Sequence, residues 1–534
     1  MLWMTIVVVV KWHVLLDPPM WDAVFGLFPA AAALADTGFD LPSLLQQPAF
    51  FEGGPNCHAE SIVTWITAGV LYACGKGQTA FCVLHLLHFA AAAWTLAVLF
   101  NFTSQCLGRL EAWLICAALL ACPLFSVQTG AMYFEMPLAA CAVSALVAYA
   151  DGQLGRAIVW SIFAVLVKQA GIVVPGALIA AVLLRSDAWS KRLILIATIS
   201  VPAVSIAVAP LLGTPLLGSF SKRRVFPDWW SFMSYHHMAY LRSIPDISLA
   251  CVLYVLCGLL LGGRIWTSLR QSPQRLSGES DNSSTEANST RNAPAKLSPL
   301  DSDTGTVGSS LLFSVGFLQL LAFMGFFFVV PFYGHLDFYC LPRYFVFVLP
   351  MLFFGLVHVA ATVSRRLASA GLVLATMWFV LNRDGTWYPA MQSNNGAIAE
   401  RAESCRWLAE NQRTVVREAS RLPADSLLLY GLPEHYFLNH PWMGYAQNRH
   451  PGGRCISLPD ERPKSLKVAD LPDRFFVILD AVILGGTSLH RILHEASEDP
   501  SRQVRVVHES SLPPFSVKLY EVSRTAEQHT ASKE

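Results

Sequence analysis

The chain has few charged residues and no marked excess of either sign. Only 14% of its 534 residues are Asp, Glu, Lys or Arg, whereas a typical soluble domain has about 25%. The net charge is +1, which gives no reason to expect a nucleic acid or another polyanion as partner. Hydrophobic residues make up 54% of the chain. This composition excludes an ordinary soluble protein and predicts an integral, multi-pass membrane protein.

The sequence also lacks the cysteine spacing of a metal or redox site. Its 12 cysteines include no Cys-x-x-Cys pair, and most of them lie in apolar segments, where cysteine behaves as a small hydrophobic residue. We therefore expect no metal and no cofactor.

Long apolar runs predict the membrane crossings, because a helix needs roughly 20 apolar residues to cross the hydrocarbon core. The first run is interrupted by Lys11 and His13 and lacks a small-residue cleavage site, so we expect a retained anchor. Lys and Arg in the short loops place the N-terminus in the cytoplasm. We predict eleven crossings, at residues 1–16, 78–100, 111–127, 131–150, 156–170, 171–184, 193–212, 247–263, 309–330, 342–361 and 367–381.

Changes in composition along the chain predict its domains. Residues 1–382 form the helical membrane domain, with a first outer loop at 17–77 and a disordered cytoplasmic linker at 265–308 that is rich in Ser, Asn, Asp, Pro and Thr. Residues 383–534 alternate between strand-like runs and helical patterns, which predicts a small α/β domain on the outer side. The predicted fold is thus an α-helical polytopic membrane protein with a small C-terminal α/β soluble domain.

The first outer loop offers several polar side chains at the membrane surface. It is half apolar but never uninterrupted for the length of a crossing, so we expect it to lie beside the membrane. Asp22 follows Trp21 at the head of an Ala-rich helix, Glu52 precedes a Gly-Gly-Pro turn, and His58 opens a second amphipathic stretch. Each of them alone could equally be a solvated loop residue or a helix cap.

Three of the ionisable residues in the apolar segments, where charge is costly and usually functional, share one depth in the predicted topology. Glu135 begins the fourth segment, Lys168 ends the fifth, and Arg343, followed by Tyr344, begins the tenth. Snorkelling of the cations and helix capping by Glu135 would explain each of them separately. In the predicted topology, however, all three lie at the outer boundary, on the side of the first loop. Such a set suits a reaction in which a base removes a hydroxyl proton while cations hold a phosphate leaving group.

The order of these residues resembles that of the polytopic GT-C glycosyltransferases. The resemblance consists of Trp21-Asp22 in a long first outer loop, an acidic residue, Glu135, shortly before a proline at the head of the fourth segment, Lys168 closing the fifth, and Arg343-Tyr344 before a late segment. The most similar branch is the dolichyl-phosphate-mannose protein mannosyltransferase and aminoarabinose transferase type. The resemblance covers about residues 1–382. The order and spacing of its motifs are more specific than any one motif.

The resemblance implies an inverting transfer of a sugar from a polyprenyl-phosphate donor to a lipid, glycan or protein hydroxyl on the outer face, without a nucleotide donor or an obligatory metal. Asp22 would be the general base, and Glu135 would position the acceptor or the sugar. Arg343, with Lys168, would bind the lipid phosphate, and Glu52, His58 and Tyr344 complete the expected binding set. Two departures leave the substrate open. Ala23 follows Asp22 where the family often has Glu, and Ala59 follows His58 where the family has Pro.

A different class of protein remains open on the sequence. A multi-span transporter or flippase of a lipid-linked or anionic substrate would also gather charges, but near the membrane midplane and between repeated halves, of which the sequence shows none. A non-catalytic receptor or assembly protein is a third possibility. The sequons at Asn101, Asn282 and Asn288 all fall on the predicted cytoplasmic side. We therefore expect a bacterial inner membrane in preference to the endoplasmic reticulum.

Overall fold

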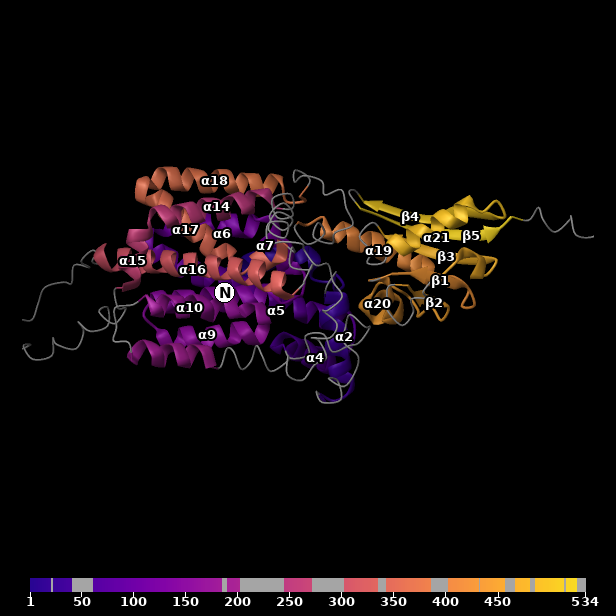
Figure 1. Cartoon of the computed structure of the whole chain (residues 1–534), viewed down its shortest axis with the longest axis horizontal. Helices are drawn as coiled ribbons and strands as arrows, with labels where there is room; N and C mark the ends of the chain where they lie inside the picture. Colours follow the sequence, from indigo (N-terminus) through magenta and orange to yellow (C-terminus); the bar gives the residue numbers. More distant parts are fainter. Residues whose placement is uncertain are drawn as a thin grey trace, which may run out of the picture.

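The structure has a helical bundle at one end and a sheet domain at the other (Figure 1). It is a computed structural model of the whole chain. It describes residues 1–20, 23–40, 61–184, 190–201, 244–270, 302–334, 342–385, 402–431, 433–456, 466–480, 486–512 and 515–525. The predicted combination of a mainly helical chain and a small C-terminal sheet is confirmed.

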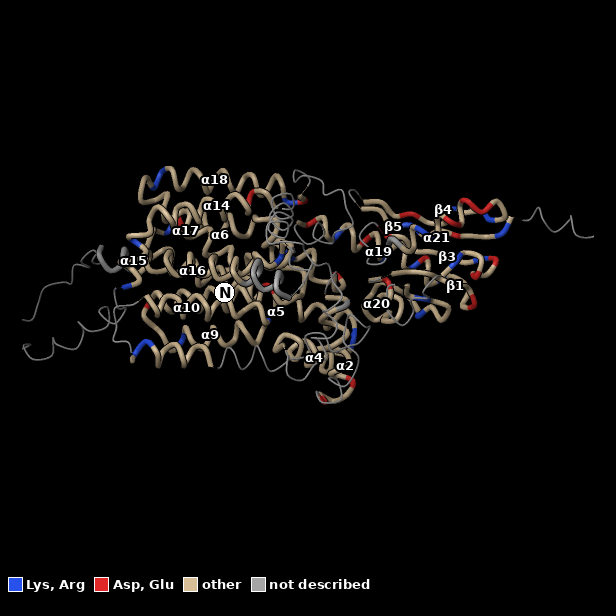
Figure 2. The backbone as a smooth tube through the Cα atoms, in the orientation of Figure 1, with Lys and Arg blue, Asp and Glu red and all other residues tan. Residues whose placement is uncertain are grey.

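The helices of the bundle are rich in Ala, Leu, Val and Phe, and Figure 2 shows almost no charge along their length. Their buried faces form one continuous apolar core. They are α1 (Leu2–Lys11), α5 (Gln78–Cys106), α6 (Arg109–Ala121), α7 (Pro123–Gly130), α8 (Glu135–Ala150), α9 (Leu154–Val167), α10 (Val173–Leu183), α14 (Pro245–Leu260), α15 (Gly262–Arg270), α16 (Ser302–Gly334), α17 (Leu349–Val363) and α18 (Arg365–Leu381).

Two of the predicted crossings are bent. Helices α6 and α7 meet at 66°, and α14 and α15 meet at 72°. The first bend falls where Pro123 begins α7, since proline lacks a backbone N–H and clashes with the preceding turn of a helix. The first bend divides the predicted crossing at 111–127, and the second falls at the end of the predicted crossing at 247–263.

The number of crossings stays unconfirmed. Among the described residues, two helical stretches are long and apolar enough to cross a membrane, α5 and residues 308–325 of α16, and the two bent pairs would raise the number to four. The prediction of eleven counted shorter helices as well. The linker is also shorter than predicted at both ends, because α15 extends to Arg270 and α16 begins at Ser302.

The first loop contains two helices that pack on each other. A π-helical turn, η2 (Ala23–Leu27), leads into α2 (Phe28–Asp36), and α4 (Ile62–Cys74) follows later. Ser61 caps α4, since its hydroxyl accepts a hydrogen bond from the Val63 N–H at 3.2 Å.

The sheet domain has five strands in the order β2-β1-β3-β5-β4, among the residues that the structure describes. Strands β2 and β3 both run parallel to β1, whereas β5 runs antiparallel to β3 and β4. Helix α19 packs on β4 and β5. The strand-like runs of the sequence, at 426–431, 474–480, 503–508 and 515–522, correspond to β1, β3, β4 and β5, whereas the three-residue β2 was not predicted. The elements are α19 (Cys405–Ala419), β1 (Leu427–Tyr430), α20 (Glu434–Asn439), β2 (Gly453–Cys455), β3 (Arg474–Asp480), α21 (Gly486–Glu498), β4 (Arg502–Leu512) and β5 (Phe515–Arg524).

Polar contacts hold the sheet domain against the bundle. Lys11, at the end of α1, forms a buried ion pair with Glu403, and Ser126 of α7 donates a hydrogen bond to the same carboxylate at 2.8 Å. Arg406 pairs with Asp17 at 2.7 Å. These contacts place the sheet domain over the end of the bundle from which the first loop begins.

Candidate active site

The candidate site begins with Glu135, the first residue of α8. Its side chain is only 2% exposed. A carboxylate at this position is favoured by the helix dipole, since the N-terminus of a helix carries partial positive charge. The backbone at Met132 has a φ of 50°, in the left-handed region, so the chain turns sharply just before the helix.

Lys168 lies in the break between two helical segments. Helix α9 ends at Val167, Lys168 is extended, and a short 3₁₀ turn, η4 (Gln169–Ile172), follows. The turn requires glycine at 171, because a Cβ there would lie 2.0 Å from the carbonyl oxygen of Ala164. This break lets the Lys168 ammonium donate a hydrogen bond to Glu135 Oε1 at 2.7 Å.

Arg343 belongs to a separate 3₁₀ turn, η7 (Pro342–Phe345), which precedes α17. Its Nε lies 3.5 Å from the same oxygen, Glu135 Oε1. Both cations are buried, Lys168 at 8% exposure and Arg343 at 3%. One carboxylate oxygen therefore has two cations beside it, and the second, Oε2, has no hydrogen-bond partner among the described residues.

Aromatic rings surround the two cations. The Lys168 ammonium lies 4.3 Å from the centre of the Tyr344 ring and 5.3 Å from that of Tyr133. The Arg343 guanidinium lies 5.1 Å from the Tyr133 ring and 5.2 Å from that of Tyr344. Cation–π contact stabilises positive charge where water is scarce. In such a low-dielectric setting the cluster would attract an anion much more strongly than the same groups would in water.

The structure thus brings together four of the residues that the sequence singled out. Glu135, Lys168, Arg343 and Tyr344 come from three distant segments and meet in one buried cluster, called the Glu135 cluster below. Asp22, Glu52 and His58 lie outside the described residues.

Described neighbours nevertheless hold two points of the first loop, Asp17 and Ser61, near this cluster. The Ser61 hydroxyl donates to the carbonyl oxygen of Val167, the residue before Lys168, at 2.6 Å. At the other point, His85 Nε2 of α5 lies 3.1 Å from the Asp17 carbonyl oxygen. One turn further along α5, His88 Nε2 lies 2.8 Å from the carbonyl oxygen of Tyr133.

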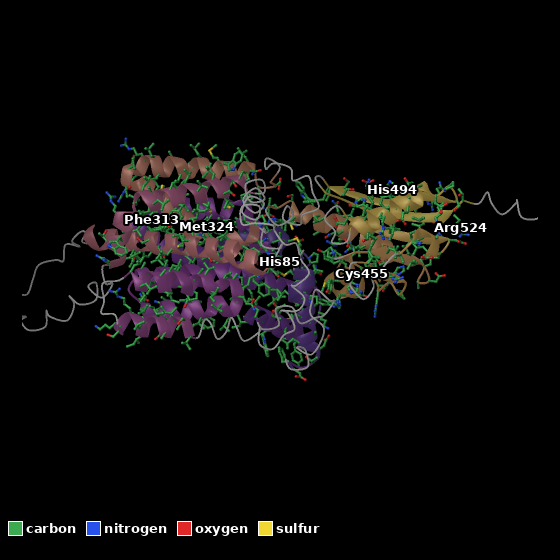
Figure 3. The ribbon with its side chains drawn as sticks, in the orientation of Figure 1. His85, Phe313, Met324, Cys455, His494 and Arg524 are labelled. Atoms are coloured by element: carbon green, nitrogen blue, oxygen red, sulfur yellow. The ribbon has the colours of Figure 1, made fainter. Side chains whose placement is uncertain are left out.

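The sequence analysis missed His85, His88 and Tyr133. Both histidines are buried, and Figure 3 shows His85 on the side of the bundle that faces the sheet domain. The available signal was the spacing His-x-x-His within the apolar segment 78–100, which places both side chains on one face of a helix. Polar residues inside such a segment are costly and so mark candidates for function.

Comparison with known proteins gives few matches. No model of a protein family matches the chain, and no curated protein matches it. Two solved structures show a weak similarity over nearly the whole chain. ArnT from Cupriavidus metallidurans bound to undecaprenyl phosphate is 14% identical over 98% of each chain, with a TM-score of 0.41. ArnT from the same organism in the apo state is 15% identical over 97% of each chain, with a TM-score of 0.40.

Proposed function

We propose that the protein is a glycosyltransferase that works at the outer face of its membrane and moves a sugar from a polyprenyl-phosphate donor to a hydroxyl acceptor. The observation that carries the proposal is the Glu135 cluster, where Lys168 and Arg343 converge on one carboxylate between the rings of Tyr133 and Tyr344. Burying two cations costs free energy, so such a cluster is a candidate for ligand binding or catalysis.

The two cations suit a phosphate leaving group. As the bond between sugar carbon 1 and the phosphate oxygen breaks, negative charge grows on the phosphate. Lys168 and Arg343 would stabilise that charge in the transition state. Arginine is well suited to this task, because its planar fork can pair with two phosphate oxygens at once.

Glu135 would position the reactants in this scheme. Its Oε1 is engaged by both cations and orients them, whereas Oε2 is the atom that could accept a hydrogen bond from a sugar or acceptor hydroxyl. A carboxylate that two cations already share is a poor choice for the group that must take up a proton.

Asp22 is the carboxylate that we assign to the proton transfer. The acceptor oxygen attacks carbon 1 from the face opposite to the phosphate, its proton passes to Asp22, and polyprenyl phosphate leaves. The configuration at carbon 1 is therefore inverted. Two contacts support this role, because they hold Asp17 and Ser61, which lie on either side of Asp22 in the chain, beside the Glu135 cluster. Glu52 and His58, in the same loop, are proposed to contact the donor or the acceptor.

The proposal includes the membrane placement expected from the sequence. Eleven crossings with a cytoplasmic N-terminus would put the Glu135 cluster and the sheet domain on the outer side of a bacterial inner membrane. The resemblance leaves the identity of the sugar open, as a hexose or a pentose.

Binding of a fluorescent short-chain polyprenyl phosphate to the purified protein in nanodiscs tests the proposal without knowledge of the sugar. We expect Arg343→Lys to weaken binding by roughly tenfold, because one charge-assisted hydrogen bond contributes about 1.5–3 kcal/mol. Arg156→Lys is the matched control, since Arg156 is exposed on α9 and bonds only to Gln153 among the described residues.

Equal binding by wild type and Arg343→Lys would contradict the proposal. A second measurement separates it from a flippase: the protein is incubated with a polyprenyl-phosphate sugar, and the acceptors are analysed by mass spectrometry. Movement of the donor between leaflets without any glycosylated product would favour the flippase.

A further inference from the structure

A cavity lies at the end of the bundle away from the sheet domain. It has a volume of about 150 Å³ and is bounded by α15, the beginning of α16 and the end of α17. Figure 3 shows Phe313, one of its lining residues, at that end of the bundle. A water molecule occupies about 30 Å³ in the liquid, so the cavity is large enough for a phosphate group and several waters.

The cavity is far from the Glu135 cluster. Helix α17 begins at Leu349, shortly after Arg343, and the cavity-lining residues His358 and Thr362 lie near its other end. From Leu349 to Thr362 the helix rises about 20 Å, at about 1.5 Å per residue. The two sites therefore lie at opposite ends of the bundle, and a ligand in one does not touch the other.

The cavity is lined by groups that can donate hydrogen bonds to an anion. Arg264 supplies a guanidinium, and Ser268 and Ser310 supply hydroxyls. His358 is fixed by its stacking on Phe354, at 5.9 Å and 12° between the ring planes. Its Nδ1 has no hydrogen-bond partner among the described residues.

Acidic side chains are missing from this lining, within the part of the chain that the structure describes. Ser314 also lines the cavity, but its hydroxyl already donates to the Ser310 carbonyl oxygen at 2.7 Å. The cavity thus combines one guanidinium, one imidazole and hydroxyl groups, which is the donor set that proteins use for phosphate.

The surroundings of the cavity favour a lipid as the source of the phosphate. Helix α15 turns away from α14 by 72° and is amphipathic, with Ile265 and Leu269 buried and Trp266 exposed. Such a helix is typical of the membrane–water boundary. Leu260, next to the cavity, is 85% exposed, and Val363 is 78% exposed, so apolar surface is available for acyl chains.

Positive charge is concentrated at the same end of the bundle. Figure 2 shows Lys and Arg at the helix ends that face away from the sheet domain, and Arg270 lies within 4.3 Å of the Trp266 ring centre. Basic residues at a membrane surface attract anionic lipids, and basic pockets between transmembrane helices bind their headgroups.

We propose that the cavity formed by α15, α16 and α17 binds the phosphate headgroup of an anionic phospholipid, in the leaflet opposite to the Glu135 cluster. Arg264 and His358 contact the phosphate oxygens, Ser268 and Ser310 complete their hydrogen bonding, and the acyl chains lie along the exposed leucines of α14.

Native mass spectrometry of the full chain, released from nanodiscs of phosphatidylglycerol and phosphatidylcholine in equal parts, tests this proposal. We expect the retained lipid to be enriched in phosphatidylglycerol by about fivefold, the factor that corresponds to roughly 1 kcal/mol for a basic residue near an anionic lipid. The double variant Arg264→Gln/His358→Asn should lose that enrichment. Arg156→Gln removes an exposed arginine outside the cavity and should keep it.

Three results would overturn the proposal. The first is an enrichment in the double variant equal to that of the wild type, and the second is an equal loss in Arg156→Gln. The third is displacement of the retained lipid by millimolar inorganic phosphate, which would show a site for free phosphate instead. Melting temperatures of all variants, measured in the same nanodiscs, show whether a loss of lipid reflects unfolding.

Discussion

Two buried lysine–glutamate pairs join distant parts of this chain, and they differ in how the carboxylate is satisfied. Glu403 is paired with Lys11 and accepts a further hydrogen bond from Ser126. Glu135 is paired with Lys168 and also has Arg343 within 3.5 Å. A second cation, Arg383, also lies 3.9 Å from Glu403 but is 43% exposed, whereas both cations beside Glu135 are buried.

We propose that the pair at Glu403 is structural and that the pair at Glu135 is functional. Burial alone would raise the pKa of Glu403, but the Lys11 ammonium and the hydrogen bonds from Lys11 and Ser126 lower that pKa to about 2. Glu403 is therefore ionised at neutral pH, and its charge is neutralised within the fold. In the Glu135 cluster both cations lie among aromatic rings, and in the proposed function they would contact the phosphate of the donor.

The largest expected effect concerns Asp22, the base in the proposed function. Asp22→Asn keeps the size of the side chain and removes its ability to take a proton. General-base assistance contributes roughly 100- to 10,000-fold, so transfer should fall by at least about 100-fold with expression unchanged. The rate of product formation in nanodiscs measures the effect.

Asp36→Asn is the control for this prediction. Asp36 lies in the same loop and makes an exposed ion pair with Lys76 at 2.6 Å, so we expect nearly normal transfer. Normal turnover of Asp22→Asn together with an inactive Glu52→Gln would move the base to Glu52.

The next effect tests the structural pair. Lys11→Met would leave the Glu403 carboxylate buried without its main partner, which typically costs about 3–5 kcal/mol. We expect a large fall in melting temperature and separation of the sheet domain from the bundle, detected by limited proteolysis near Glu403. The double variant Lys11→Met/Glu403→Gln should recover most of the loss.

Lys76→Met is the matched control, because the Lys76–Asp36 pair is exposed and contributes at most about 1 kcal/mol. If both lysine variants lowered the melting temperature equally, Lys11 would have no special structural role.

The same substitution in the Glu135 cluster should affect function more than stability. In Lys168→Met, Glu135 keeps Arg343 as a partner, so the melting temperature should fall less than in Lys11→Met. Donor KM should rise roughly 10- to 100-fold, because a charge-assisted contact to phosphate is lost. A stability loss as large as that of Lys11→Met, with unchanged donor KM, would make the two pairs equivalent and remove the basis for a phosphate site.

The sequence predicted the members of the Glu135 cluster because ionisable residues are rare in apolar segments. Glu135, Lys168 and Arg343 stand out for that reason, and their common depth predicted that they would meet. The exact pairing could not be predicted, since it depends on the helix break at Lys168 and the close turn that Gly171 permits.

The sheet was also largely predictable, because its strands alternate with helical patterns. Strand β2 has three residues and no periodic signal. The link between Lys11 and Glu403 spans 392 residues, so no local pattern could indicate it.

A third buried carboxyl group extends the comparison, because its nearest charged neighbour is another acid. Glu434, at the start of α20, is fully buried beside Asp480 at the end of β3, and Gln412 donates to Asp480 at 2.6 Å. Burial and the negative charge of Asp480 raise the pKa of Glu434 well above its ordinary value. Two carboxyl groups in contact can share a hydrogen bond only when one of them is protonated.

The smallest effect that we predict follows from this shared proton. Because the pKa of Glu434 is raised in the folded state, its contribution to stability is complete below the ordinary pKa of about 4.3 and is lost as the pH rises through the folded-state value. The sheet domain should therefore become less stable towards alkaline pH. Glu434→Gln replaces the shared proton with an amide donor and should flatten this dependence, with a gain on the order of 1 kcal/mol per pKa unit removed. Hydrogen exchange of the β1 and β3 amides between about pH 6 and about pH 9 measures the stability of the sheet domain separately from that of the bundle. Glu410→Gln, at an exposed position of α19, should leave the wild-type slope unchanged, and an equally steep slope in Glu434→Gln would show that Asp480 carries no shared proton.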